Sequence, residues 1–311
     1  MRDDAKTVSS SRSTAGSQPN HWAGGSKPQP GLYLVATPIG NLDDITLRAG
    51  KLLQSADCVA CEDTRTTGRL LTLLGLEAAA LVPYHEHNAE RARPALLARL
   101  RGGAVVALVS DAGTPLLSDP GFRLVRACLA DGIAVTSVPG ASALLPALQL
   151  SGLPCDRFLF VGFLPPKAAA RRHALADLAA VRATLVIYES PRRLAAALAD
   201  MAAVLGGRDA AVARELTKLY EEVRRAPLDQ LATHYAAAGP PKGEVVVVVG
   251  PPDASPPAGQ AEIDARLAEA LQHLSARDAA IQVAAALGVP RRQVYARALA
   301  LGRAAGQGGP P

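Results

Sequence analysis

Short apolar runs alternate with longer amphipathic stretches from residue 32 onward, and this alternation predicts most of the secondary structure. In the first half of the chain, the apolar runs predict strands at 32–37, 57–61, 81–84, 104–109 and 133–138. The stretches between them predict helices at 46–55, 65–74, 88–101, 120–131 and 141–150. Apolar strands that alternate with helices are typical of a parallel sheet covered on both faces. We therefore expect an N-terminal α/β domain with a parallel sheet at 31–152.

The same alternation restarts after residue 152. Apolar runs predict strands at 158–163, 184–189, 211–215, 221–225 and 244–250. Amphipathic stretches predict helices at 167–181, 192–205 and 227–237. A hairpin-like segment at 217–222 joins two of these strands, and a hairpin requires antiparallel pairing. We expect a second α/β domain with a mixed sheet at 153–250.

The two ends of the chain differ from this pattern. Residues 1–30 are rich in serine and poor in apolar side chains, which predicts a disordered tail, and 304–311 form a second tail. Prolines at 251–261 predict a linker before a helical module at 262–303, with helices at 263–274, 276–287 and 291–301. The short break between the last two helices resembles a helix-turn-helix, and the basic third helix suits either a structural cap or a nucleic-acid contact.

Composition narrows the function classes. The net charge is +5 and arginine supplies 27 of the 33 cationic side chains, which permits a phosphate-rich partner such as RNA, although a GC-rich genome would also enrich arginine. No apolar run reaches the roughly 18–20 residues that a membrane-spanning helix needs. The first 31 residues lack the apolar segment of a signal peptide, and four cysteines suggest no disulfide framework. We expect a cytoplasmic protein with no membrane contact.

Loops rich in glycine, proline, aspartate and serine follow the predicted strands of the first domain. They read Thr37–Asn41, Glu62–Arg65, Ser110–Pro115 and Pro139–Ala143. Ligands of open α/β sheets bind beyond the carboxyl ends of the strands, so these loops predict a cleft at one edge. The chain contains neither a G-x-G-x-x-G pattern nor a P-loop, which disfavours a pyrophosphate cofactor.

Two short motifs could bind metal. Cys58 and Cys61 are three residues apart in a predicted strand, so their side chains should point to opposite faces. His85-Glu86-His87 follows another strand and either binds a metal or lines the cleft, and we favour the second interpretation. We expect no metal site.

The second domain also carries charged residues at its strand ends. They occur in Tyr188-Glu189-Ser190, Arg214–Lys218 and Lys242-Gly243-Glu244. Ion pairs that hold the sheet together would explain them as well as a second wall of the cleft would.

Taken together, these motifs resemble one family. The segments that carry the resemblance are Thr37–Thr46, Glu62–Arg65, Ser110–Pro115, Asp119–Gly121, Gly162–Pro165, Tyr188–Ser190 and Ala213–Lys218. In this order, over roughly residues 31–301, they are similar to the ribosomal RNA small subunit methyltransferase I family of the tetrapyrrole methylase superfamily.

The resemblance implies a class III S-adenosylmethionine methyltransferase with two α/β domains and a three-helix module. It implies a homodimer that methylates the ribose 2′-oxygen of a decoding-centre cytidine in 16S rRNA. On the superfamily's pattern, the cofactor residues are Pro38, Gly40, Asn41, Ser110, Asp111, Ala112, Gly113, Pro115, Gly140, Ser142, Leu216 and Gly243.

The base that would accept the ribose proton stays open at this point. Candidates near the cleft are Glu189 and Asp63, which we favour, and also Glu215 and His87. The cations expected to contact RNA are Arg65, Arg214, Lys218, Arg291 and Arg292. Two rival functions remain: a methyltransferase acting on carbon atoms of a tetrapyrrole, and a non-catalytic RNA-binding factor.

Overall fold

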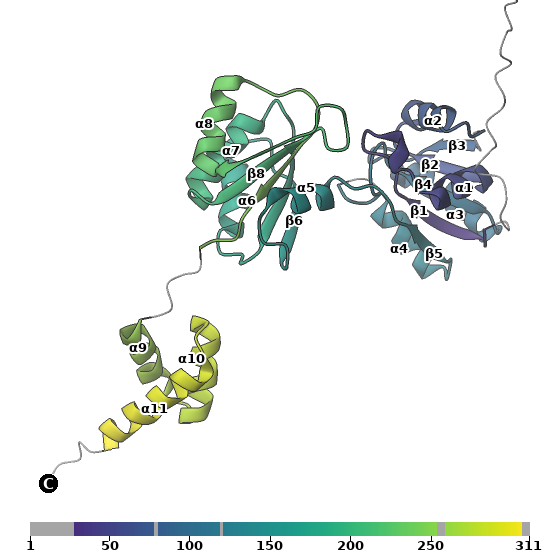
Figure 1. The fold of residues 1–311 in the computed structure, drawn as a ribbon. Helices are drawn as coiled ribbons and strands as arrows, with labels where there is room; N and C mark the ends of the chain where they lie inside the picture. Colours follow the sequence, from purple (N-terminus) through teal and green to yellow (C-terminus); the bar gives the residue numbers. More distant parts are fainter. Residues whose placement is uncertain (1–27, 78–79, 119–120, 254–258, 307–311) are drawn as a thin grey trace, which may run out of the picture.

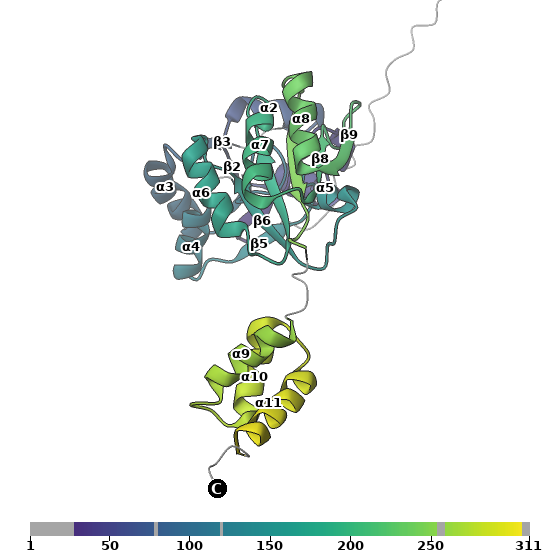
Figure 2. The ribbon, with the colours of Figure 1, turned by 90° about the vertical axis from the view of Figure 1, so that its left-hand side faces the viewer.

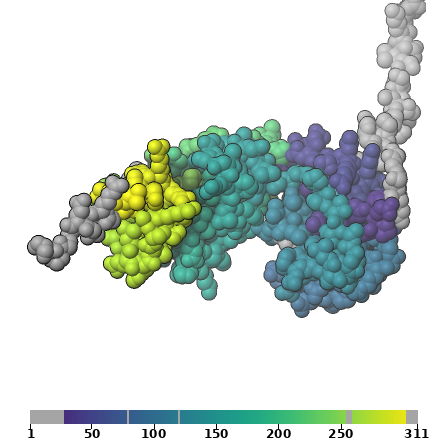
Figure 3. Space-filling view, turned by 90° about the horizontal axis from the view of Figure 1, so that it is seen from below, coloured from purple at the N-terminus to yellow at the C-terminus, as the bar shows by residue number. Residues whose placement is uncertain are grey.

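The computed structural model describes residues 28–77, 80–118, 121–253 and 259–306. Two α/β units follow one another along the chain, and a helical module completes the described part (Figure 1). Figure 3 shows them in chain order, from the first unit in purple and blue, through the second in teal and green, to the module in yellow. This arrangement confirms the fold class expected from the sequence. Residues 1–27 of the predicted N-terminal tail, the middle of the predicted linker and residues 119–120 lie outside the described residues.

The first sheet is parallel throughout, as predicted, with the strand order β3-β2-β4-β1-β5. Its strands are β1 (Gly31–Val35), β2 (Cys58–Cys61), β3 (Ala80–Pro83), β4 (Val105–Val109) and β5 (Val135–Val138). The connecting helices are α1 (Leu47–Ser55), α2 (Thr64–Leu73), α3 (Ala89–Arg101) and α4 (Phe122–Ala130), with a short 3-10 turn η1 (Leu42–Asp44) before α1. Every residue of β4 is buried because an apolar cluster covers each face of the sheet.

The cysteines of β2 confirm the alternation expected for a strand. Cys58 belongs to the apolar cluster on one face and Cys61 to the cluster on the other face. Burial raises the pKa of both thiols, so both are held in the neutral form.

The second sheet is mixed, as predicted, with the strand order β6-β7-β10-β8-β9. Its strands are β6 (Phe158–Phe163), β7 (Thr184–Glu189), β8 (Asp209–Arg214), β9 (Glu222–Pro227) and β10 (Val245–Val249). Strands β6 and β7 pair in parallel, and the other pairs are antiparallel. Helices α6 (Ala168–Leu178), α7 (Leu194–Leu205) and α8 (Leu228–Ala238) cover one face of this sheet.

Helix α5 (Leu144–Ser151) differs from the prediction in its partner. The sequence placed this helix in the first domain, but Leu144, Ala147 and Leu148 pack on strands of the second sheet. In Figures 1 and 2, α5 lies on the opposite side of that sheet from α6, α7 and α8. The side chain of Ile39, from the loop after β1, packs against the same cluster. Helix α5 therefore links the two units through apolar contact.

The helical module consists of α9 (Gln260–Ala270), α10 (Ala276–Leu287) and α11 (Arg291–Gly306). Helix α11 extends past its predicted end at 301, so residues 304–306, which were predicted to belong to the C-terminal tail, are helical. The hydroxyl of Ser275 accepts a hydrogen bond from the Asp278 backbone N–H at the start of α10. Gly288, with φ of 63°, ends the same helix in the left-handed conformation that glycine adopts freely. No helix among the described residues combines the length and apolar character needed to cross a membrane.

The buried pair of Arg171 and Asp200 permits a stability test. Asp200 accepts hydrogen bonds from Arg171 at 2.7 Å and from Arg172 at 3.2 Å, and the Arg171 side chain is 5% exposed. Asp200→Ala leaves the buried guanidinium without its counter-charge, so we expect the free energy of unfolding to fall by about 3–5 kcal/mol. Urea denaturation measures this value. The exposed pair of Arg101 and Asp131 is the control, because Asp131→Ala should cost less than about 1 kcal/mol.

Candidate functional site

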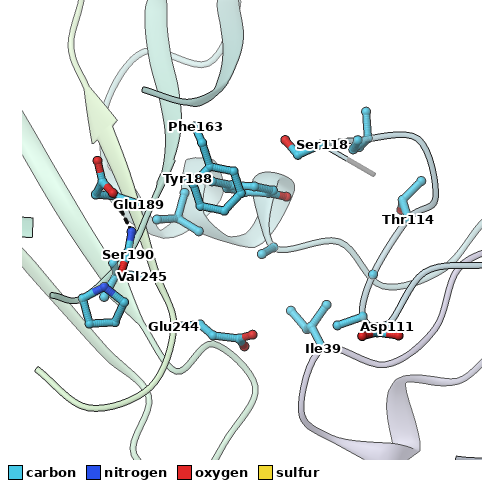
Figure 4. Close-up of a pocket in the computed structure, with 16 residues that line it drawn as sticks. Ile39, Asp111, Thr114, Ser118, Phe163, Tyr188, Glu189, Ser190, Glu244 and Val245 are labelled. Carbon is cyan, nitrogen blue, oxygen red and sulfur yellow. Dashed lines mark hydrogen bonds between the residues drawn. The ribbon is translucent and has the colours of Figure 1, made fainter. Parts of the chain in front are cut away.

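A cavity of about 430 Å³ is lined by residues of both α/β units (Figure 4). The loops that follow β1 and β4 contribute Ile39, residues 111–114, Leu117 and Ser118, and Ala143 precedes α5. The second unit contributes residues from the ends of β6 and β7 and from the start of β10. Lining residues include Ile39, Asp111, Thr114, Ser118, Phe163, Tyr188, Glu189, Ser190, Glu244 and Val245. The cavity therefore lies where the sequence predicted a cleft, beyond the carboxyl ends of parallel strands.

Backbone hydrogen bonds hold the loop after β4 in place. Gly113 and Thr37 exchange two backbone hydrogen bonds of 2.9 Å, which form an isolated antiparallel bridge. The hydroxyl of Thr114 donates a hydrogen bond to the Ala141 carbonyl, and the hydroxyl of Ser110 donates one to the Ala112 carbonyl within the same loop. Gly113 has φ of 77°, and a Cβ there would approach Ile39 to 3.3 Å. The loop thus presents small residues and backbone groups to the cavity.

The wall from the second unit combines two aromatic rings, Phe163 and Tyr188, with the carboxylate of Glu244. Tyr188 contacts Phe163 edge-to-face, with ring centroids 5.8 Å apart. Glu244 accepts a hydrogen bond of 2.8 Å from Lys218, and its side chain remains mostly exposed. Figure 4 shows the Glu244 carboxylate directed across the opening toward Ile39 and Asp111 of the first unit. The cavity therefore offers an apolar surface and two carboxylates that can accept hydrogen bonds.

Of the twelve cofactor residues expected from the resemblance, Asp111, Ala112 and Gly113 line the cavity. The other nine are not among its lining residues: Pro38, Gly40, Asn41, Ser110, Pro115, Gly140, Ser142, Leu216 and Gly243. A Cβ on Gly40 would collide with Lys218, and one on Gly243 would collide with Glu215, so these glycines permit close packing. Ile39 lies in the loop that the sequence predicted for the cleft, but Phe163 and Val245 were not among the expected site residues, because an apolar residue at a strand end carries no distinctive signal.

Glu189 is a poorly placed base in this structure. Its side chain is fully buried. One carboxylate oxygen accepts a hydrogen bond of 2.6 Å from the Ser190 backbone N–H and forms an ion pair of 2.6 Å with the Arg193 guanidinium. The other oxygen is buried without a hydrogen-bond partner. Side chains alternate along β7, so Glu189 lies on the same face as Leu185 and Ile187, which belong to the cluster beneath α6, α7 and α8. The ring of Tyr188 lies on the other face, in the cluster that contains α5. Glu189 thus lines the cavity, but its carboxylate is buried and held by Arg193.

Asp63 is also a weak candidate. Its carboxylate caps α2 by accepting a hydrogen bond of 2.8 Å from the Arg65 backbone, and it forms an ion pair of 2.6 Å with the Arg65 side chain. These hydrogen bonds lower the pKa of Asp63 from 3.8 to about 2. A carboxylate with so low a pKa holds a proton too weakly to be an efficient base near neutral pH.

A second cavity, of about 500 Å³, lies beyond the ends of β2 and β3. Its lining residues are Glu62, Asp63, Thr64, Arg65, Pro83, His85, Glu86, His87 and Asp111. The histidine motif therefore lines this cavity. Within the described part of the chain, no group of three or more histidine, cysteine or carboxylate residues is arranged to hold a metal. Asp111 belongs to the walls of both cavities, so the two adjoin there.

The five cations predicted to contact RNA fall into two groups. Arg214 pairs with Glu222 at 3.1 Å, and Lys218 donates to Glu215 and Glu244 at 2.8 Å, so both take part in ion pairs within the second unit. Arg65, by contrast, is 89% exposed. Arg291 and Arg292 are exposed at the start of α11. The accessible cations thus lie beside the second cavity and on the helical module.

Comparisons with known proteins support one family. A family model described as Tetrapyrrole (Corrin/Porphyrin) Methylases matches residues 31–232, and one described as RsmI C-terminal HTH domain matches residues 257–302. A protein from Mesorhizobium japonicum named ribosomal RNA small subunit methyltransferase I is 53% identical over 281 residues, covering 90% of this chain and 95% of the relative. The chain belongs to this methyltransferase family.

Other similar proteins agree with the assignment. A relative of the same name from Erythrobacter litoralis is 53% identical over 273 residues, covering 88% of this chain and 95% of the relative. The structure of a cobalt precorrin-4 methyltransferase covers 76% of this chain and 98% of its own, with a TM-score of 0.54 and 19% identity. At 19% identity, the similarity to the cobalt precorrin-4 methyltransferase establishes a shared fold and nothing more.

The ion pair at Asp63 predicts a pH-dependent contribution to stability. The pKa of Asp63 in the folded state is depressed, so the charged side chain stabilises the fold above about pH 4 and this contribution is lost as the pH falls through about 2. We expect Asp63→Asn to be less stable than the wild type at neutral pH, with a difference that shrinks between about pH 4 and pH 2. Urea unfolding across this range measures it. A difference that does not change with pH would contradict the assignment.

Proposed function

We propose that this protein transfers a methyl group from S-adenosylmethionine to the ribose 2′-oxygen of a decoding-centre cytidine in 16S rRNA, within the small ribosomal subunit. The observation that carries the proposal is the two-walled cavity at Asp111 in a chain 53% identical to ribosomal RNA small subunit methyltransferase I. S-adenosylmethionine, the cofactor expected from the sequence, agrees with membership in a methyltransferase family.

The residues of the first cavity suit this cofactor. Its volume of about 430 Å³ lies within the roughly 300–1,000 Å³ of small-molecule sites. Ile39, Phe163 and Val245 offer apolar contact for a nucleoside, and Asp111 and Glu244 offer acceptors for hydroxyl or ammonium groups. We assign the backbone of residues 111–114 to the cofactor because Gly113 leaves room for close approach. When bound, the cofactor supplies a methyl group on a sulfonium, which needs no further activation.

The chemical task of the protein is then positioning and proton removal. Alignment of two reacting groups in one site can lower a barrier by about 7–11 kcal/mol at best, provided that their geometry is favourable. A ribose hydroxyl is a weak nucleophile until its proton is accepted, so a base near the acceptor oxygen is required. Residues of the two units line the cavity from both sides, so each unit can contribute to aligning the reacting groups.

A tetrapyrrole methyltransferase is the rival within the same fold. The likeness to the cobalt precorrin-4 enzyme does not favour it, because at 19% identity only the fold is shared. The match of residues 257–302 to a helix-turn-helix domain favours a nucleic-acid substrate. A non-catalytic RNA-binding factor would keep this module but would not bind the cofactor.

A methylation assay tests the proposed function. Small subunits from a strain that lacks this gene are incubated with purified protein and S-adenosylmethionine, and mass mapping locates the new ribose methyl groups. We expect one methylated cytidine with the wild type. Asp111→Ala removes an acceptor from the cofactor wall, so calorimetry should show at least about tenfold weaker cofactor binding, equivalent to about 1.4 kcal/mol.

Asp177→Ala is the matched control, because Asp177 is exposed on α6 outside both cavities. Its cofactor affinity and activity should equal those of the wild type. Methylation of a porphyrinogen but not of rRNA would favour the tetrapyrrole reading, and absence of cofactor binding by the wild type would favour the RNA-binding factor. Unchanged affinity in Asp111→Ala would contradict the cofactor assignment.

We also propose that Arg291 and Arg292 contact phosphates of the rRNA. Both are exposed, and the first turn of α11 contains no acidic residue. Binding to the small subunit should weaken as salt rises, and the double variant R291A/R292A should reduce the slope of log K against log salt by about one to two. Arg277→Ala, on the neighbouring α10, is the control. The homodimer expected from the resemblance stays a prediction.

A further inference from the structure

Three carboxylates follow β2 and β4 at the edge of the second cavity, and they differ in how they are held. Asp63 is engaged by Arg65, as described above. Asp111 accepts a hydrogen bond of 3.1 Å from the Asp63 backbone N–H and also faces the first cavity. Glu62 is half-buried, and none of the described residues donates a hydrogen bond to its carboxylate or forms an ion pair with it. Of these three carboxylates, Glu62 is the one that has neither a hydrogen-bond donor nor an ion-pair partner among the described residues, so it can accept a proton.

The second cavity has the composition of a site for a nucleotide. One part of its lining is acidic, with Glu62 and Asp111, and another part is cationic or titratable, with Arg65, His85 and His87. The exposed guanidinium of Arg65 can approach a phosphate, while the acidic part can accept hydrogen bonds from a ribose. Since Asp111 belongs to both walls, a ribose bound here would lie next to the proposed cofactor cavity.

We propose that the second cavity receives the target nucleotide and that the Glu62 carboxylate accepts the proton of its ribose hydroxyl. This inference rests on the proposed function. The ribose oxygen forms a bond to the methyl carbon, the carbon–sulfur bond breaks with its electron pair on sulfur, and the hydroxyl proton passes to a Glu62 oxygen. The neutral thioether and the methylated ribose leave, and Glu62 returns its proton to solvent, so no further reactant is needed.

The charges around Glu62 suit this role. Burial raises the pKa of Glu62, the negative charge of Asp111 raises it further, His85 lowers it, and Asp63 adds a smaller upward contribution. A base must be deprotonated before the reaction but must hold a proton during it, so a raised pKa makes Glu62 a stronger base than Asp63. Arg65, Glu86 and His87 complete the titratable lining.

The test is the variant Glu62→Gln, which keeps the shape of the side chain but cannot accept the proton. We expect kcat for methylation of small subunits to fall by about 10²–10⁴-fold. The affinity for S-adenosylmethionine should stay within about twofold of the wild type, because Glu62 does not line the first cavity. The affinity for the subunit should also stay within about twofold, because glutamine keeps the shape of the side chain and its oxygen can still accept a hydrogen bond. Glu77→Gln is the matched control and should leave kcat unchanged. Glu77 is exposed and precedes β3, so it lies near the amino end of that strand, whereas the second cavity lies beyond the carboxyl end.

The pH profile supplies a second, independent readout. The wild-type kcat should fall on the acidic side as Glu62 becomes protonated, and this limb should disappear in Glu62→Gln. His85→Gln removes a group that lowers the pKa of Glu62, so the limb should move to higher pH while activity persists. Glu62→Asp should retain more activity than Glu62→Gln.

The outcomes separate the inference from the proposed function. A wild-type kcat retained by folded Glu62→Gln would overturn the assignment of Glu62 while leaving the proposed function intact. Loss of the acidic limb in His85→Gln instead would assign the proton to His85. A wild type that binds the cofactor but leaves every 16S ribose unmodified would overturn both proposals. Weaker subunit binding with unchanged kcat in Glu62→Gln would assign Glu62 to substrate binding alone and would also overturn the inference.

Discussion

The contact of α5 and Ile39 with one face of the second sheet is the interaction on which the site depends. Leu144 and Leu148 are almost fully buried there, and burial of each leucine side chain contributes about 1.5–3 kcal/mol. This apolar contact places the ends of β7 and β10 opposite the loops after β1 and β4. Residues of both units then form the walls of the cavity. The two units are also joined by a hydrogen bond of 2.5 Å from the Thr217 hydroxyl to the Asp44 carboxylate. Apolar burial stabilises the contact between the units, and a directional bond of this kind helps to fix their orientation.

Charge is distributed around the two cavities according to a simple rule. Carboxylates with an arginine neighbour, such as Asp63 and Glu189, have structural partners and are withheld from chemistry. Carboxylates without one, such as Glu62 and Asp111, face open space. Hydrogen bonds from Arg65 lower the pKa of Asp63, whereas burial raises the pKa of Glu62, so the pKa values of these two neighbouring carboxylates move in opposite directions. The same fold can thereby keep one acidic group permanently charged and another available for proton transfer.

The fold by itself is shared by enzymes that act on different substrates, so the site and the module must distinguish them. The cobalt precorrin-4 methyltransferase shares the architecture at 19% identity, whereas the rRNA methyltransferase relatives also match along most of the chain. Two features here suit a nucleic acid: the exposed cations beside the second cavity and the basic start of α11. Both are surface features, which packing does not require, and this is why they are informative about function.

The sequence alone determined the two sheets, their parallel and mixed character, and the edge at which the site lies, because apolar periodicity and turn residues are local signals. It also showed that Cys58 and Cys61 point to opposite faces, since a strand alternates regardless of its neighbours. It did not show that α5 packs on the second sheet, nor that Ile39 and Val245 line the same cavity from opposite units. Only the tertiary structure decided which carboxylate is free: Glu62, Asp63 and Glu189 read alike in a sequence, and their difference lies in which side chains the fold brings against them.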